Sequence, residues 1–475
     1  MKTRLSRPIA LLTLVPALLL LAGSQATATS GTDWTSYLNG PAHSSFAPAE
    51  QAITTANAPL LHTAWTWKAD PPTQPGQPAN KLFASPTVYA GHIYIGAATG
   101  DFYSLTEATG TVDWKRSFGF TTGTCKARGI TSTAAVDLDP VTGNPTVYVG
   151  APDGYLYALD AVTGNVQWSA FVVAPGTDQN EGYIWGSPTI FNGEVFIGMA
   201  SNCDTALIRG GVKAFDLATG NLIGTYYTVP EGALGGSVWT SLAATSAGSS
   251  TWAFATTGNA DFGSGAEQGD SFSIVRLDGA TMTRQDIWTV PGLATTDKDF
   301  GASPVLFHGT VNGTSTRLVG ACNKVGKFYA LRQSHLAAGP VWKRHIGSVC
   351  LAAAIWDSAQ SRLFIASDAT TVNGQAVEGA VRKLNPSTGA TIWETALPGQ
   401  VFGTASLDGA GVLAISLYQV ADHSGNGTYL VDASNGAILA ALPTGGAGFS
   451  QPVFANGYLF VASVGGRLTA FAPPG

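Results

Sequence analysis

One ten-residue stretch recurs along the chain and limits what it can fold into. Its clearest copy runs from Leu159 to Trp168, Leu-Asp-Ala-Val-Thr-Gly-Asn-Val-Gln-Trp, and similar copies begin at Leu105 and Leu384. Residues 215–224 and 431–440 keep the turn but lose the Trp. Asp or Asn starts such a turn by accepting backbone N–H groups, and Gly takes the position of positive φ. Each copy therefore predicts a β-hairpin whose second strand begins near the Trp.

The spacing of the copies predicts the architecture. Alternating apolar runs such as 147–150 and 195–198 precede the turns, as in half-buried strands. Gly110 and Gly164 are 54 residues apart, and Gly389 and Gly436 are 47 apart, which is the length of a four-stranded propeller blade. The sequence therefore predicts an all-β, eight-bladed β-propeller of four-stranded antiparallel blades, with blades beginning near Ser85, Thr131, Trp185, Gly235, Phe300, Leu351, Phe402 and Phe449.

The two ends of the chain predict how the ring closes. The last unit, 451–471, has three strands, whereas the early strand 63–69, Thr-Ala-Trp-Thr-Trp-Lys-Ala, has no blade of its own. We expect this N-terminal strand to complete the last blade and hide the sheet edges. Residues 29–62 are polar and turn-rich and are expected to form an N-terminal rim segment, with the propeller spanning 63–475.

Composition and the N-terminus restrict the function classes. Only 11% of residues are charged and the net charge is -6, so the chain offers no basic stripe for nucleic acid. Lys2, Arg4 and Arg7 precede an apolar run, 9–22, and a small-residue site, 26–28. This pattern predicts a signal peptide over 1–28, a secreted or periplasmic protein, and no membrane span after cleavage. A membrane anchor is the alternative, but the run is shorter than the ~20 residues needed to cross a bilayer.

Four cysteines in an exported chain can pair in three ways, and the sequence does not choose outright. The preferred pairs are Cys125 with Cys203 and Cys322 with Cys350, because each pair falls in neighbouring blades and export supplies an oxidising compartment. Free buried thiols remain the alternative. The sequence contains no Cys-x-x-Cys-His, so no c-type haem attachment is expected.

The repeat consensus and the count of eight resemble the quinoprotein propellers, which bind pyrroloquinoline quinone (PQQ), and in detail the polyvinyl alcohol dehydrogenase-like proteins. The resemblance covers about residues 34–471. Its most specific stretch is 297–304, Asp-Lys-Asp-Phe-Gly-Ala-Ser-Pro. The resemblance implies that Asp299 is the general base acting on an alcohol, beside a Ca²⁺ ion, since a carboxylate can both accept a proton and ligate a hard cation. The alternative is an Asp that caps a turn.

The same resemblance implies further metal ligands. Asn259, after Thr-Thr-Gly, stands where the family has an amide ligand of calcium. The family adds a Glu from the third blade, and Asp204 is the nearest residue in chemistry at that place. The expected metal ligands are therefore Asn259, Asp299 and Asp204.

Three residues correspond to the family's cofactor contacts. Lys324, in 323–331, would polarise the C5 carbonyl of the quinone, and Trp239 would stack on the planar cofactor. Arg128 would pair with a cofactor carboxylate. The alternatives are a solvated strand-end Lys and a Trp that only packs blade against blade.

Two functions follow from these residues. The first is an exported PQQ-dependent alcohol dehydrogenase that oxidises a small or polymeric alcohol and passes electrons to a separate acceptor such as a cytochrome c. The second is a non-catalytic propeller that binds a protein or glycan, as in the scaffold of the outer-membrane β-barrel assembly machinery. A polar axial pocket with converging carboxylates would favour the enzyme, and an exposed aromatic and apolar rim would favour the scaffold.

Overall fold

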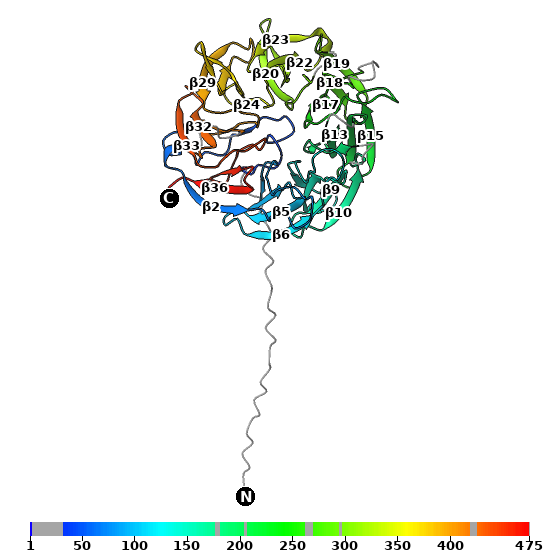
Figure 1. Ribbon diagram of the computed structural model, residues 1–475, viewed down its shortest axis with the longest axis vertical. Helices are drawn as coiled ribbons and strands as arrows, with labels where there is room; N and C mark the ends of the chain where they lie inside the picture. The colour runs from blue at the N-terminus through cyan, green and yellow to red at the C-terminus, as the bar shows by residue number, and fades with distance from the viewer. Residues whose placement is uncertain are drawn as a thin grey trace.

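The computed structural model describes residue 1 and residues 32–474, except 176–180, 204–206, 262–268, 294–296 and 419–424. Eight antiparallel sheets follow one another around a ring, and the colour changes steadily around it (Figure 1). The fold is thus the predicted eight-bladed propeller. The signal peptide expected over 1–28 lies outside the described residues apart from Met1.

Each blade is a four-stranded meander whose first strand lies toward the axis and whose last strand lies at the circumference (Figure 1). Blades 1 to 4 contain β3 (Thr87–Tyr89), β4 (His92–Gly96), β5 (Asp101–Thr106) and β6 (Val112–Ser117); β7 (Ala135–Leu138), β8 (Pro145–Gly150), β9 (Tyr155–Asp160) and β10 (Val166–Phe171); β12 (Thr189–Phe191), β13 (Glu194–Ser201), β14 (Gly211–Asp216) and β15 (Leu222–Tyr227); and β16 (Ala243–Ala247), β17 (Ser250–Thr256), β18 (Ser273–Asp278) and β19 (Arg284–Thr289). Blades 5 to 8 contain β20 (Val305–Val311), β21 (Thr314–Cys322), β22 (Lys327–Arg332) and β23 (Pro340–His345); β24 (Ile355–Asp357), β25 (Arg362–Ser367), β28 (Gly379–Leu384) and β29 (Thr391–Leu397); β30 (Ser406–Asp408), β31 (Val412–Ser416), β32 (Thr428–Asp432) and β33 (Ile438–Leu442); and β34 (Val453–Ala455), β35 (Tyr458–Ala462), β36 (Arg467–Ala472) and β2 (His62–Lys68). Short strands β1 (Phe46–Ala47), β11 (Gly182–Tyr183), β26 (Thr370–Val372) and β27 (Gln375–Val377) lie outside this scheme.

The ring closes as predicted. Strand β2 pairs antiparallel with β36, with Thr66 opposite Thr469 and Trp67 opposite Leu468. The eighth blade therefore joins segments from both ends of the chain, which lie side by side (Figure 1). Closure removes the edges that an open array of sheets would expose.

The recurring Trp and Gly join neighbouring blades. Trp114 on β6 lies over the hairpin turn of blade 2, where a Cβ at Gly164 would come within 2.6 Å of the indole. The Trp114 Nε1–H group donates to the backbone oxygen of Ala161 (3.1 Å). The corresponding Trp–Gly pairs are Trp65–Gly110, Trp168–Gly220, Trp342–Gly389 and Trp393–Gly436. Gly is needed at this position both for its positive φ and because any side chain would collide with the Trp.

A ring of hydroxyl groups ties the innermost strands together. At six of the eight blades, the position two residues before the innermost strand donates its backbone N–H to a Ser or Thr oxygen of the next blade. These bonds run from Ser85 to Thr133, Thr133 to Ser187, Ser187 to Ser241, Ser241 to Ser303, Ala353 to Thr404 and Gln451 to Ser85. Ala353 and Gln451 are the two equivalent positions that have no hydroxyl group.

The N-terminal segment lines the inside of the ring. Its backbone carbonyls from Trp34 to Ser45 accept N–H groups from the innermost strands of blades 1, 2, 4, 5, 6 and 7. Trp34, Leu38 and Ile53 are fully buried. Residues 34–45, part of the rim segment expected over 29–62, thus lie along the innermost strands, because their carbonyls pair with N–H groups on the axial edges of those strands.

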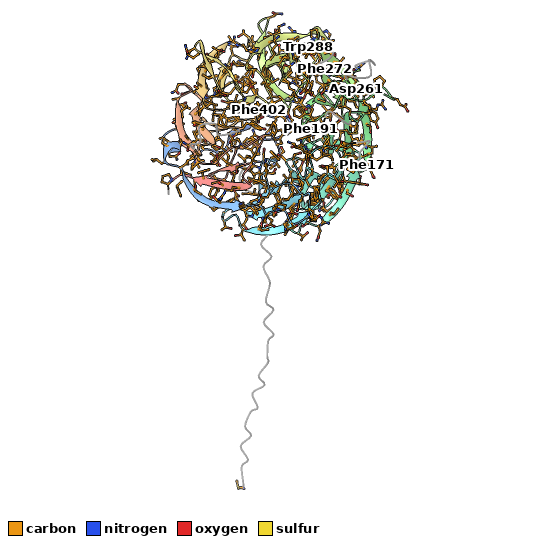
Figure 2. All side chains as sticks on the ribbon, viewed as in Figure 1. Phe171, Phe191, Asp261, Phe272, Trp288 and Phe402 are labelled. Atoms are coloured by element: carbon orange, nitrogen blue, oxygen red, sulfur yellow. A yellow bond between two sulfur atoms is a disulfide. The ribbon has the colours of Figure 1, made fainter. Side chains whose placement is uncertain are left out.

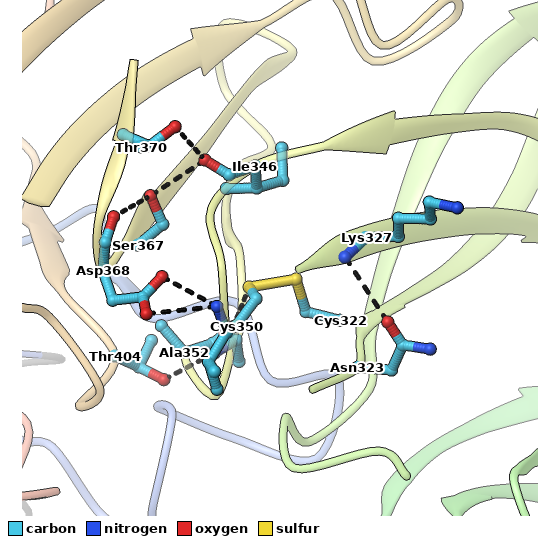
Figure 3. Close-up of a disulfide and its surroundings, with 12 residues drawn as sticks. Cys322, Asn323, Lys327, Ile346, Cys350, Ala352, Ser367, Asp368, Thr370 and Thr404 are labelled. Atoms are coloured by element: carbon cyan, nitrogen blue, oxygen red, sulfur yellow. Dashed lines mark hydrogen bonds between the residues drawn. A yellow bond between two sulfur atoms is a disulfide. The ribbon is translucent and has the colours of Figure 1, made fainter. Parts of the chain in front are cut away.

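Both predicted disulfides are present. Cys125 and Cys203 have Cα atoms 6.0 Å apart, and Cys322 and Cys350 have Cα atoms 5.5 Å apart. The second bridge joins the end of β21 to the loop before β24, and thus blade 5 to blade 6 (Figure 3). Among the described residues, no helix is long and apolar enough to cross a membrane.

Candidate functional site

A cavity of about 540 Å³ lies at the axis of the ring. Its walls include the hydroxyl residues Ser85, Thr133, Ser187, Ser241 and Ser303, so it sits against the innermost strands of blades 1 to 5. Tyr37 of the N-terminal segment also lines it. Five predicted site residues line this one cavity: Arg128, Trp239, Asn259, Asp299 and Lys324.

Asp299 and Lys324 form a buried ion pair. An antiparallel bridge between Phe300 and Asn323, together with the bond from Lys324 N to Asp299 O (2.8 Å), fixes the two backbones beside each other. Lys324 Nζ lies 2.7 Å from Asp299 Oδ1 and 2.5 Å from Asp297 Oδ1. Asp299 is 1% exposed, whereas the Asp297 side chain is 56% exposed.

Burial and charge oppose each other in this pair. Burial raises the pKa of Asp299 above its ordinary value, although the Lys324 ammonium and the Trp239 N–H group act to lower it. Burial acts to lower the pKa of Lys324, but the charges of Asp299 and Asp297 outweigh it and raise the pKa. Lys324 is therefore held as a cation, and Asp299 is a carboxyl group with an increased affinity for a proton.

Trp239 orients the carboxylate. Its Nε1–H group donates to Asp299 Oδ2 (2.9 Å), and Lys324 Nζ lies 4.9 Å from the centre of the indole ring. The ring also packs on Gly301, where a Cβ would come within 2.8 Å of Trp239 Cη2 and 2.2 Å of Leu351 Cδ2. The absence of a side chain at Gly301 therefore leaves room for both Trp239 and Leu351 above it.

Asn259 lies next to this group. Its backbone oxygen accepts from Gly236 N (2.7 Å), and its neighbour Gly258 packs so closely that a Cβ there would lie 3.3 Å from Asp299 Oδ2. Calcium usually takes six to eight oxygen ligands. Among the described residues, the predicted ligands Asn259 and Asp299 do not complete such a set, and Asp204 lies outside the described residues.

Arg128 occupies another part of the wall. Its Nε–H group donates to Asn202 Oδ1 (2.8 Å), and its guanidinium carbon lies 4.3 Å from the centre of the Trp185 ring. Trp185 donates in turn to Ser201 O (3.0 Å). These contacts orient Arg128 within the cavity, since a guanidinium stacked on an aromatic ring loses rotational freedom.

The Cys125–Cys203 bridge belongs to the same part of the wall, since Cys203 also lines the cavity. Glu181 is fully buried, and its carboxylate accepts from Cys125 N (2.9 Å) and from the hydroxyl of Thr124. Although Cys125, Glu181 and Cys203 are close enough to suggest a metal site, both sulfurs are used in the disulfide. The cluster therefore anchors the loop that carries Arg128.

The remaining wall is aromatic. Phe402 lies 4.7 Å from Tyr418 and 6.3 Å from Phe449, measured between ring centres, and the Phe402 and Phe449 rings are within 17° of parallel. Phe83 and Leu351 complete this wall. Figure 2 shows Phe402 near the middle of the ring, whereas Phe171 lies at its outer edge.

Sequence reasoning missed part of the site. Asn202 and Trp185 line the cavity beside Arg128, yet the family pattern drew attention to Asp204 instead. The run Trp185-Gly186-Ser187-Pro188 at the start of a blade was the available signal. No sequence signal pointed to the aromatic wall, because Phe402 and Phe449 are far apart in the sequence and resemble ordinary blade starts.

Comparisons with known proteins agree with this arrangement. Residues 34–340 match the family model described as "Glucose/ethanol/alcohol dehydrogenase, beta-propeller domain", and residues 377–474 match "Outer membrane protein assembly factor BamB". A quinohemoprotein alcohol dehydrogenase, ADH IIB, of Pseudomonas putida is 31% identical over 210 residues, which are 44% of this chain and 28% of that protein. The dehydrogenase subunit of the quinone alcohol dehydrogenase of Gluconobacter oxydans is 32% identical over 202 residues, 42% of this chain and 25% of that subunit. The match thus spans less than a third of the length of these relatives.

Solved structures show the same fold at low identity. The quinohemoprotein alcohol dehydrogenase of Comamonas testosteroni superposes with a TM-score of 0.72 at 18% identity, covering 94% of this chain and 81% of that one. BamB from Moraxella catarrhalis has a TM-score of 0.53 at 15% identity, covering 87% of this chain and 97% of that one. These likenesses describe the fold alone.

Proposed function

Because the chain belongs to the family of glucose, ethanol and alcohol dehydrogenase β-propeller domains, we propose that it is a PQQ-dependent alcohol dehydrogenase. The observation that carries this proposal is the convergence of Asp299, Lys324 and Trp239 within one axial cavity. A carboxylate, a cation and an aromatic ring are what an acidic planar quinone and an alcohol hydroxyl require together.

The residues of the cavity fit the cofactor. Its volume, about 540 Å³, is within the usual range for small-molecule sites. Lys81, Lys126, Arg128 and Lys324 place four cationic side chains on its walls, which suits a ligand with several carboxylates. Asp299 Oδ1 is buried and lies 2.7 Å from the Lys324 ammonium, so this carboxylate is already paired with a cation inside the cavity.

Asp299 would act as the general base. Its Oδ1 faces Lys324 and its Oδ2 is held by Trp239, so the carboxylate cannot rotate freely. A raised pKa strengthens its affinity for the proton of the alcohol hydroxyl as the carbinol carbon is oxidised to a carbonyl. PQQ, when bound, would supply the oxidant that takes up the two electrons and the hydrogen from that carbon.

Lys324, Trp239 and Arg128 would bind and orient. The Lys324 ammonium would stabilise negative charge on an oxygen placed next to it, and the Trp239 ring would present a flat face to a planar ligand. Arg128, held by Asn202 and Trp185, would pair with a carboxylate. These three groups are partly buried, which lowers the local dielectric and strengthens each interaction.

Calcium is a separate part of the proposal. Asn259 and Asp299 would provide two oxygen ligands, and Asp204 would provide a third. No step described above depends on the metal. We also propose that the protein is exported to the periplasm or secreted, and that electrons leave to a separate acceptor such as a cytochrome c.

Reconstitution tests the proposal. The purified mature protein is titrated with PQQ, with and without Ca²⁺, while tryptophan fluorescence reports binding and a redox dye reports turnover of added alcohols. We expect saturable quenching through Trp239 and Trp185, and dye reduction that needs both quinone and alcohol. Absence of quenching and of dye reduction with every alcohol would refute the enzyme and leave the binding propeller as the alternative.

A further inference from the structure

The cavity has two chemically different walls that face each other. Blades 1 to 5 contribute the hydroxyl groups and the charged residues, whereas blades 1 and 6 to 8 contribute an aromatic wall made of Phe83, Leu351, Phe402, Tyr418 and Phe449. The residues proposed to bind the cofactor and to accept the proton all lie on the first wall. The proposed chemistry gives the aromatic wall no task.

The aromatic wall is accessible rather than packed away. Phe449 is 37% exposed, although side chains of this size are usually buried, and it stands almost parallel to Phe402. Tyr418 contacts both rings, at 4.7 Å from Phe402 and 5.7 Å from Phe449. A cluster of partly exposed rings lining a cavity keeps apolar area in water that an apolar ligand would cover.

The wall connects directly to the proposed catalytic carboxylate. Leu351 and Trp239 both lie over Gly301, where a side chain would collide with both. Trp239 in turn donates to Asp299. Asp299 and the aromatic wall line the same cavity, so an alcohol whose hydroxyl lies at Asp299 can extend its carbon chain toward the rings.

We infer that this aromatic wall is a binding subsite for the apolar substituent of the alcohol, so that the protein prefers alcohols with a long alkyl or aryl group to ethanol. The inference rests on the proposed function for the position of the hydroxyl group. Each buried methylene contributes about 0.8 kcal/mol, or about fourfold in binding, so chain length should have a measurable effect.

The first experiment compares the reconstituted enzyme on ethanol and 1-hexanol. We expect wild type to show a kcat/KM at least tenfold higher for 1-hexanol. Phe449→Ala should reduce the hexanol-to-ethanol ratio about tenfold, and Phe449→Leu should reduce it less because it keeps apolar area. Phe171→Ala, at an exposed position on the outer strand β10, is the matched control and should leave the ratio unchanged. Equal kcat/KM values for the two alcohols in wild type would overturn the inference.

A binding experiment separates this inference from the proposed function. Binding of 1-hexanol to the quinone-free protein is measured by saturation-transfer NMR for wild type, Phe449→Ala and Phe402→Ala. Weaker binding in both variants supports the subsite even if no alcohol is oxidised, in which case only the enzyme proposal fails. Hexanol binding that is the same in all three proteins overturns the subsite even if the enzyme is active.

Discussion

Blades 2–5 and blades 6–8 face the same cavity with different chemistry. The first group supplies Arg128, Trp239, Asn259, Asp299 and Lys324 from the loops that lead into or between its strands, whereas the second supplies Leu351, Phe402, Tyr418 and Phe449. Both groups use the same four-stranded blade and the same Trp–Gly contacts between blades. The framework therefore sets where side chains point, and loop residues decide what they do.

The two groups also differ in the ring of hydroxyl groups. It is continuous from Ser85 to Ser303, where the charged residues must be held in place. It has gaps at Ala353 and Gln451, in the group that supplies the aromatic side chains. The Cys322–Cys350 bridge crosses between the groups, since Cys322 is two residues before Lys324 and Cys350 is next to Leu351 (Figure 3).

Removing the carboxylate of Asp299, the proposed proton acceptor, should have the largest effect on the charged side. Asp299→Asn keeps a side chain of the same shape but cannot accept the alcohol proton, so we expect kcat to fall by about 10²–10⁴-fold. Quinone binding should survive in part, because Trp239 and Lys324 remain. Dye reduction by the reconstituted variant measures the loss.

The neighbouring carboxylate provides the control. Asp297 also contacts Lys324, but its side chain is 56% exposed. The Trp239 N–H group donates to Asp299 and not to Asp297 among the described residues. Asp297→Asn should therefore change kcat only a few-fold. Equal losses of kcat in the two variants would show that the rate depends on the number of carboxylates that neutralise Lys324. It would then not depend on a base at Asp299.

The fold could be predicted from sequence because its determinants are local and repeated. Hairpin turns such as Asp160 to Gly164 depend on neighbouring residues, and the Asp160 carboxylate does accept from the Thr163 N–H group (2.8 Å). Five copies of the turn along the chain show the period. The closing strand β2 was predictable for the same reason, since a blade with three strands requires a fourth.

The site was only partly predictable, because it is assembled across blades. A family pattern located Asp299, Lys324 and Trp239, but the pairing of Arg128 with Asn202 joins residues 74 positions apart. The position of the N-terminal segment was not predictable from its polar composition. Its few apolar residues, Trp34 and Leu38, are fully buried inside the ring.

Removing the cation should shift the pH profile of the charged side. Lys324 acts to lower the pKa of Asp299, so Lys324→Ala should raise that pKa further above the ordinary carboxyl range. Because the base must be ionised to accept a proton, kcat should then fall off at a higher pH on the acidic side. We expect a loss of about 10- to 100-fold at neutral pH.

A charge-preserving variant checks the cause. Lys324→Arg keeps a cation near Asp299, so the acidic limb of its kcat profile should stay close to that of wild type. If Lys324→Ala lowers activity but leaves the acidic limb unmoved, the ammonium does not control the protonation of Asp299.

The other group contains a carboxyl group that makes stability depend on pH. Asp408, on the innermost strand of blade 7, is fully buried, and burial together with the charge of Glu50 raises its pKa from 3.8 to about 8. The folded state then holds a proton that the unfolded chain releases between pH 3.8 and 8, so stability should decrease as pH rises through that range. Urea unfolding at pH 5 and pH 8 measures the decrease, and Asp408→Asn should reduce it. A stability that rises between these pH values in wild type would contradict the assignment.

The smallest effects on stability should come from substitutions in the ring of hydroxyl groups. They test whether its continuous part, from Ser85 to Ser303, and its part with gaps differ in backbone structure or only in side chains. Ser241→Ala removes the acceptor of the Ser187 N–H group (2.8 Å) and leaves a buried donor unpaired, which should lower the free energy of unfolding by about 1–3 kcal/mol. Ala353→Ser places a hydroxyl group at one of the two gaps, where the N–H group of Ser303 in blade 5 is the equivalent donor. If the backbone at Ala353 has the same geometry as at the positions that carry a hydroxyl group, the free energy of unfolding of this variant should rise by up to about 1 kcal/mol. A loss instead would mean that the apolar side packs too tightly around Ala353, which is 3% exposed, to accept the oxygen.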